Sequence, residues 1–201
     1  MRVLLATLAV ALAAPLAAQG TPPMLNRPAP PPSTERPLNW AFDLSLEYGG
    51  DVYITLPFTD GSSQDLAAGQ GGTISVGADY RPTSLPKFGV RALAGIKWSS
   101  NAAENSNISF TRIPIEVVGS YYIDNDWRVG AGLAYHAMAN FNGDGFVPDR
   151  EYDPAAGYTV ELGWRWLALT YTGIEYAWDG GPAVDASAIG VSLNWVFKKP
   201  K

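Results

Sequence analysis

The stretch LNWAFDLSLEYG, from Leu38 to Gly49, decides the fold of this chain. Apolar residues occupy every even position from Leu38 to Tyr48, whereas the odd positions carry Asn, Ala, Asp, Ser, Glu and Gly. A period of two over this length indicates an extended strand with two chemically different faces. If water surrounds the protein, the apolar row belongs to a core. If lipid surrounds it, the apolar row faces outward.

The same alternation returns along the chain and predicts about eight strands with no substantial helix. Five further segments alternate without interruption: 73–81, 88–99, 126–137, 157–166 and 188–197. Two others, 108–122 and 167–178, change parity once, between Phe110 and Ile113 and between Tyr171 and Ile174. A change of parity by one residue is what a β-bulge produces, so we predict a bulge at each place.

The connections between these segments alternate in length. Long or medium segments are expected at 50–72, 99–107, 140–154 and 178–185, and short turns at 82–87, 124–126 and around Trp166. Short turns at one end and long loops at the other are typical of an up-and-down outer-membrane barrel. The pattern therefore predicts an all-β protein, an eight-stranded antiparallel up-and-down transmembrane β-barrel.

The N-terminus predicts export from the cytoplasm. Arg2 precedes an apolar run that ends in the small residues Ala17 and Ala18, which is the layout of a signal peptide over residues 1–18. Residues 19–37 are proline-rich and predict an extended periplasmic spacer. The barrel is expected over 38–197 and a short tail over 198–201. Because the chain has no cysteine, a disulfide scaffold is excluded.

Aromatic residues on the apolar faces favour lipid outside, because they gather at strand ends. Two girdles around an aliphatic band match two membrane–water interfaces, whereas a water-soluble core has no reason to keep aromatics away from strand centres. The short-turn end carries Trp40, Tyr80, Phe88, Trp127, Trp164, Trp166, Trp195 and Phe197, and the long-loop end carries Tyr48, Trp98, Tyr135, Tyr158 and Tyr176.

The opposite faces carry glycine and charges of both signs, which predicts a charge network inside the barrel. Its expected members are Asp43, Glu47, Asp79, Arg91, Arg112, Glu116, Arg128, His136, Glu161, Arg165 and Glu175, and Lys97 lies on the same polar face. A buried charge without a partner is costly, so each should find an opposite charge or a trapped water. Arg128 is expected to pair across strands with Glu116 or Glu161.

Two stretches resemble a known family. GSYYIDNDWRVGAGLAYHA (119–137) and the closing DASAIGVSLNWVF (185–197) are similar to the small outer-membrane β-barrel superfamily, whose members resemble the transmembrane domain of outer membrane protein A. Gly190, Leu193, Trp195 and Phe197 match the family's terminal signal, although Ala188 stands where a polar residue is usual. The resemblance implies residence in the bacterial outer membrane and insertion by the barrel-assembly machinery.

The sequence offers little support for catalysis. An eight-stranded barrel has room for packed side chains and hardly for a channel, which disfavours a general-diffusion porin. Some small barrels resemble lipid A deacylases or acyltransferases, which need a serine, a histidine and a carboxylate. The single histidine, His136, is followed at two positions by Met138, where the deacylase pattern has serine. We therefore expect no enzyme activity and no cofactor.

One loop has the spacing of a calcium-binding loop. NFNGDGFVPDRE (140–151) fits D-x-[DN]-x-[DN]-G-x5-E except at its first position. Hard oxygen ligands would suit Ca²⁺, and they would come from Asn140, Asn142, Asp144 and Glu151. A glycine- and asparagine-rich hairpin loop explains the same residues without a metal.

The function that follows is a structural or surface-interaction role in the outer membrane. Two alternatives remain: a small barrel that binds or passes a hydrophobic small molecule, and a lipid-modifying membrane enzyme. The expected partners are outer-membrane lipid and, during biogenesis, the barrel-assembly machinery. Nucleic acid is not expected, because the chain is acidic, with a net charge of −5.

Overall fold

The computed structural model describes residues 37–57, 63–103, 106–179 and 181–197. The expected leader, nearly all of the expected spacer and the tail lie outside the described residues. No helix of the described part is long and apolar enough to cross a membrane.

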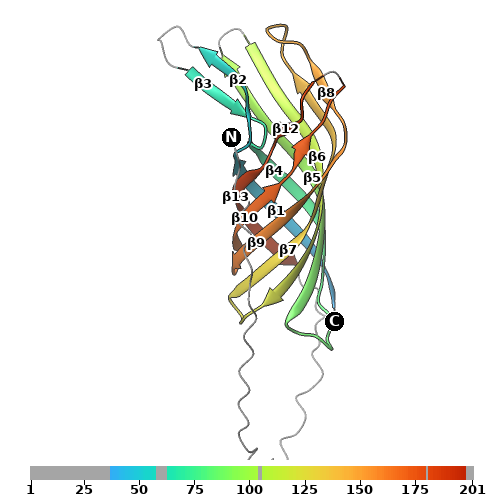
Figure 1. The fold of residues 1–201 in the computed structure, drawn as a ribbon. Helices are drawn as coiled ribbons and strands as arrows, with labels where there is room; N and C mark the ends of the chain where they lie inside the picture. The colour runs from blue at the N-terminus through green and yellow to red at the C-terminus, as the bar shows by residue number, and fades with distance from the viewer. Residues whose placement is uncertain (1–36, 58–62, 104–105, 180, 198–201) are drawn as a thin grey trace, which may run out of the picture. The chain divides into compact units, whose positions relative to one another are not determined.

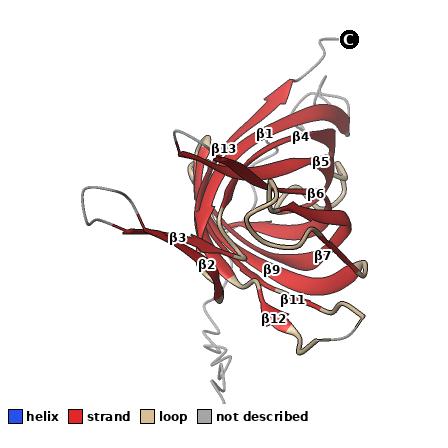
Figure 2. Ribbon diagram, turned by 90° about the horizontal axis from the view of Figure 1, so that it is seen from above, coloured by secondary structure: helices blue, strands red, loops and turns tan. Residues whose placement is uncertain are grey.

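In the described part of the chain, eight antiparallel strands form the closed up-and-down barrel that the alternation predicts (Figures 1 and 2). Each strand pairs with the next along the chain, the β6–β7 pairing completes the ring, and the last strand pairs with the first. The strands are β1 (Leu38–Tyr48), β4 (Gly71–Tyr80), β5 (Phe88–Ala103), β6 (Ser106–Tyr122), β7 (Trp127–Asn142), β9 (Ala155–Trp164), β10 (Leu167–Gly173) and β13 (Ala188–Phe197).

The two ends of the barrel differ, as predicted. The connections 81–87, 123–126 and 165–166 are short and lie at one end, where β1 begins and β13 finishes. The connections at the other end carry further short strands: β2 (Val52–Pro57), β3 (Ser63–Ala67), β8 (Arg150–Tyr152), β11 (Glu175–Tyr176) and β12 (Val184–Asp185). In outer-membrane barrels the short turns are periplasmic and the long loops extracellular. We use those two terms for the two ends.

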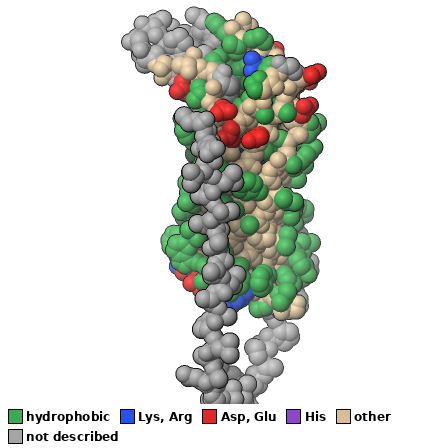
Figure 3. All heavy atoms as spheres, viewed as in Figure 1, with side chains coloured by type: hydrophobic (Ala, Val, Ile, Leu, Met, Phe, Trp, Pro, Cys, Tyr) green, Lys and Arg blue, Asp and Glu red, His purple; other side chains and the backbone are tan. Residues whose placement is uncertain are grey.

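The apolar row of β1 faces outward. Trp40, Leu46 and Tyr48 are 61, 72 and 65% exposed, while Asp43 and Ser45 are buried in the barrel. Large exposed apolar side chains continue around the wall, and hydrophobic atoms cover much of the face drawn in Figure 3. Because burying polar groups and exposing apolar ones is favourable only where lipid lies outside, the inside-out arrangement predicted from the alternation is confirmed.

The aromatic girdles occupy the predicted ends of the strands, with one exception. On β5 the two girdles are marked by Phe88 and Trp98, both exposed, which at about 3.3 Å per residue and a tilt near 40° are separated by about 25 Å along the barrel axis. That distance matches the apolar band of outer-membrane barrels. The exception is Tyr176, predicted to face lipid, which is buried inside the barrel.

Three strands continue past the extracellular girdle. β5 runs to Ala103 and β6 begins at Ser106, so most of the loop predicted at 99–107 is strand. The loop prediction was wrong because polar residues such as Ser99 and Ser106 obscured the alternation, although backbone pairing does not require apolar side chains. β7 continues to Asn142 and pairs there with β8.

Neither of the two strands predicted to carry a bulge changes parity, but a bulge does lie beside the first predicted place, in the neighbouring strand: β6 keeps Phe110, Arg112 and Pro114 all inward. The β6–β7 register shifts between Thr111 and Ile113, and β7 supplies the additional residue near Met138, whose φ is +50°. The second bulge was wrong, since β10 pairs without a shift and Ile174 simply points inward. The inward residues of this segment change from polar (Thr172) to apolar (Ile174 and Tyr176). In the sequence, this change of chemistry looks like a change of the face that points inward.

Candidate functional site

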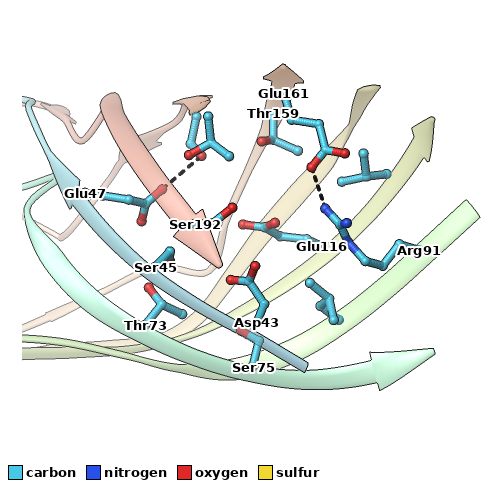
Figure 4. A pocket seen from close by; sticks show the side chains of 14 residues that line it. Asp43, Ser45, Glu47, Thr73, Ser75, Arg91, Glu116, Thr159, Glu161 and Ser192 are labelled. Carbon is cyan, nitrogen blue, oxygen red and sulfur yellow. Dashed lines mark hydrogen bonds and ion pairs between the residues drawn. The ribbon is translucent and has the colours of Figure 1, made fainter. Parts of the chain in front are cut away.

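The interior of the barrel holds most of the predicted charges, and Glu161 of β9 is the centre of the larger group. Its carboxylate accepts a hydrogen bond from Nη2 of Arg91 at 2.5 Å and from Nε of Arg128 at 3.0 Å. The hydroxyl of Ser120 donates to the same carboxylate at 3.3 Å. All four side chains are buried, and Figure 4 shows Arg91 reaching Glu161 across the interior. Glu161 is one of the two partners expected for Arg128.

Two glycines on the polar face make room for this group. A Cβ on Gly163 would lie within 2.7 Å of Nη1 of Arg128, and one on Gly130 would lie 2.7 Å from Cγ of Glu161. Gly163 is directly opposite Arg128 in the β7–β9 ladder, and Gly130 is opposite Glu161. The inward glycines therefore allow long charged side chains to lie flat against the barrel wall.

A second ion pair joins β5 and β1 across β4. Nζ of Lys97 pairs with a carboxylate oxygen of Glu47, and their side chains are 2 and 9% exposed. The hydroxyl of Thr172 donates to the other oxygen of Glu47 at 3.4 Å. Lys97 was placed on the polar face from the sequence but not included in the network. Because its neighbours Ile96 and Trp98 face lipid, the alternation alone places Lys97 inside the barrel, where the network lies.

A small polar cavity separates these two groups. Its volume is about 30 Å³, and Asp43 and Glu116 point into it together with Ser45, Thr73 and other hydroxyls (Figure 4). Neither Asp43 nor Glu116 has an ion-pair partner within 4.0 Å in the described part of the chain. A cavity of this size has space for about one or two water molecules, not for a ligand or a continuous pore.

We call the ion-paired groups around Glu161 and around Glu47 the charged layer. Above it, the extracellular part of the interior is filled by apolar side chains. We call this group the apolar plug; it consists of Ala68, Ile108, Phe110, Ala139, Phe141, Tyr152, Ala155, Ile174, Tyr176 and Ala186. The ring of Phe110 lies at its centre, with ring centroids of Phe141, Tyr152 and Tyr176 at 6.4, 5.6 and 5.7 Å. The plug was not predicted from the sequence. Ile108 and Phe110 at inward positions of their strand were the available signal.

Arg112 lies between the plug and the charged layer. It is fully buried, its Nη2 donates to the carbonyl of Gln70 at 2.7 Å, and its guanidinium carbon lies 4.4 Å from the ring centroid of Phe110. No carboxylate lies within 4.0 Å of it among the described residues. A carbonyl and the faces of aromatic rings therefore stabilise this cation instead of an acid.

The single histidine contacts the plug as well. Nδ1 of His136 lies 2.5 Å from the hydroxyl of Tyr176, and both side chains are buried. A nucleophilic mechanism would need a serine and a carboxylate beside His136. A tyrosine hydroxyl inside an apolar cluster is a structural partner instead.

Two predicted members of the network lie outside it. Arg165 occupies the two-residue turn between β9 and β10 with a φ of +54°, and its side chain is 56% exposed and paired with Asp126 of the adjacent turn. Glu175 is exposed because Ile174 and Tyr176 on either side of it point inward. Arg165 was assigned to the interior by extending the inward parity of β9 past its last residue, Trp164. Glu175 was assigned to the interior by assuming a change of parity before Ile174, which the chain does not make. Asp79 points inward and pairs with Arg81 at 3.1 Å.

The proposed calcium loop is a β-hairpin. Asn140 and Glu151 are opposite each other in the β7–β8 ladder, and Oδ1 of Asn142 accepts the backbone amide of Asp144 at 2.8 Å. The φ values of Asp144 and Gly145 are +51° and +78°, as a tight turn requires. Within the described ranges, no group of three or more His, Cys, Asp or Glu side chains is placed to hold a metal ion. The hairpin and its turn account for this spacing without a metal, and the calcium site stays a prediction.

The periplasmic mouth is polar and closely bonded. Arg128 donates through Nη1 to the carbonyl of Arg165 at 2.7 Å and through Nη2 to Asn194 at 3.1 Å. In the adjacent β6–β7 turn, Oδ1 of Asp124 accepts the amides of Asp126 and Trp127. These two backbone bonds hold the pKa of the exposed Asp124 carboxyl below its usual value. Arg128 is thus hydrogen-bonded across this end of the interior, and its side chain lines an open polar pocket of about 360 Å³ at the mouth, together with Arg81 and Tyr122.

These observations define the class of protein. A closed eight-stranded barrel with an apolar, aromatic-bordered exterior and an interior of paired charges is an integral β-barrel of the bacterial outer membrane. Its exterior contacts membrane lipid.

Comparisons with known proteins add the following. Solved structures similar to the chain include the crystal structure of Ail, the attachment invasion locus protein of Yersinia pestis, with a TM-score of 0.41 and 10% sequence identity over 79% of this chain and 97% of that chain. No family model matches the sequence. A search of curated proteins gave no match.

Proposed function

We propose that this outer-membrane barrel is a non-conducting, non-enzymatic envelope protein that acts through its extracellular surface. The observation that carries the proposal is the filled interior. Along the barrel axis, the apolar plug, the charged layer and the bonded periplasmic mouth follow one another, and the polar cavity within has a volume of only about 30 Å³. A solute or a hydrophobic ligand would have to displace buried, hydrogen-bonded side chains to enter.

The experiment that tests the filled interior is conductance. Purified protein inserted into a planar lipid bilayer is expected to give no discrete current steps in 1 M KCl, because no continuous water column connects the two ends. A general-diffusion porin inserted in the same way serves as the positive control. Regular current steps from the folded, heat-modifiable protein would contradict the proposal and favour a channel.

The extracellular end supports a surface role by its structure and its charge. β5, β6 and β7 extend beyond the girdle and carry paired strands, so this surface is ordered. Nine exposed acidic side chains lie there, and Figure 3 shows acidic atoms gathered toward that end: Asp51, Asp65, Asp144, Asp149, Glu151, Asp153, Glu175, Asp179 and Asp185. A surface of one sign attracts partners of the other, so the partner would be basic.

Charge neutralisation tests this surface. The protein in a nanodisc is expected to bind poly-lysine-coated beads, and the triple variant Glu151→Gln, Asp153→Asn, Glu175→Gln is expected to bind them several-fold less at low salt. The difference should disappear in about 1 M salt, where the screening length is about 3 Å. A matched variant at the periplasmic end, Asp126→Asn, should bind like the wild type. Equal binding by the triple variant would contradict the proposed role of the acidic surface.

A further inference from the structure

A groove of about 590 Å³ lies on the outer wall of the barrel, at its periplasmic end. It spans the neighbouring strands β5, β6 and β7 and the turn before β5. Its walls are the large apolar side chains of Tyr80, Leu85, Phe88, Val90, Tyr121 and Val129. This part of the barrel wall belongs to the lipid-facing surface, since five of these side chains are at least 41% exposed and Tyr121 is 38% exposed.

The groove exists because two small outward residues are adjacent. Gly119 of β6 is directly opposite Ala131 of β7, and on its other side it faces Val90 of β5. A Cβ added at Gly119 would meet only the carbonyl oxygen of Ala131, at 3.7 Å. Crowding therefore does not require glycine at this position. The neighbouring outward positions of β6 and β7 carry the larger side chains of Val117, Tyr121 and Val129.

A cation stands at the rim of the groove. Lys87 immediately precedes Phe88 of the periplasmic girdle, is exposed, and its Nζ lies 5.8 Å from the ring centroid of Tyr121. Lysine at this level of a barrel reaches the headgroup region of the membrane. The groove thus combines an apolar hollow at the depth of acyl chains with a positive charge at the depth of phosphates.

We propose that this groove binds one phospholipid of the periplasmic leaflet. One acyl chain lies on Gly119 and Ala131, between the aromatic walls, and the phosphate lies beside Nζ of Lys87. A second copy of the barrel fits less well, because a two-fold contact would set one hollow against the other and leave both unfilled. The inference depends on the membrane orientation of the barrel and is independent of the role proposed for its extracellular surface.

Native mass spectrometry tests the site with phosphatidylglycerol as the probe. The wild-type protein in detergent is expected to retain one added phosphatidylglycerol, and Gly119→Leu, which fills the hollow, is expected to lower its affinity about tenfold or more. Ala94→Leu, a comparable enlargement of the lipid-facing side of β5 away from the groove, should bind like the wild type. Lys87→Gln should keep binding but lose the preference for phosphatidylglycerol over phosphatidylethanolamine.

Two results of these binding experiments would overturn the proposal. Equal retention by Gly119→Leu and wild type would mean that the groove is not the site, and a dimer dispersed by Gly119→Leu would mean that a second barrel occupies it. Heat-modifiable mobility in gels verifies that each variant is folded. If Gly119→Leu does not fold, Ala131→Leu fills the same hollow from the neighbouring strand and gives the same reading.

Discussion

Replacement of Glu161 with glutamine is expected to lower the free energy of unfolding by about 3–5 kcal/mol. Glu161 is the carboxylate that pairs with both Arg91 and Arg128, and all three side chains are buried. The neutral amide keeps the shape of the side chain but removes the direct ion-pair partner of two buried guanidinium groups. Urea titration of the protein folded in phospholipid vesicles, followed by tryptophan fluorescence, measures the change.

The matched control is Glu175→Gln, which makes the same chemical change at an exposed position. Its effect should be within about 0.5 kcal/mol of zero. A loss of less than about 1 kcal/mol at Glu161 would mean that water solvates both arginines and that the interior is wider and wetter than the packing indicates. The channel hypothesis would then return.

Replacement of Phe110 with alanine is expected to destabilise the extracellular end by about 3–5 kcal/mol, the cost of a large cavity in a packed apolar cluster. Phe110 is 1% exposed, its ring contacts those of Phe141, Tyr152 and Tyr176, and it covers the guanidinium of Arg112. Its removal leaves a void and takes an aromatic face from a buried cation. Urea titration in vesicles reports the total loss, and amide hydrogen exchange reports where it falls.

Exchange should accelerate in the extracellular parts of β5, β6 and β7 and remain slow between the two girdles. Phe146→Ala is the control, since this side chain is 62% exposed at the tip of the β7–β8 hairpin and its loss should change stability by less than about 0.5 kcal/mol. Uniform acceleration along the whole barrel would show that the plug and the membrane-spanning part unfold together, which would contradict a plug that is a separate layer.

The eight strands, their up-and-down order and the face that meets lipid could all be assigned from the sequence alone. These features depend on the backbone, because side chains of a strand alternate between two faces whatever their neighbours are. The row from Trp40 to Tyr48 was therefore assigned to the outside correctly before any partner strand was known. Turn lengths fixed the order of the strands for the same local reason.

The side chains that fill the interior at each level could be identified only from the folded barrel. The stagger of the strands brings Glu161 between Arg91 and Arg128 and Lys97 beside Glu47, and this stagger is a property of the closed ring rather than of one strand. Closure of the barrel also packs Phe110 and Tyr176 together in the apolar plug. From the sequence, Phe110 indicated a bulge and Tyr176 was assigned to the extracellular girdle. A strand pattern shows that a side chain points inward, whereas only the packed barrel decides whether an ion, an aromatic ring or a cavity meets it there.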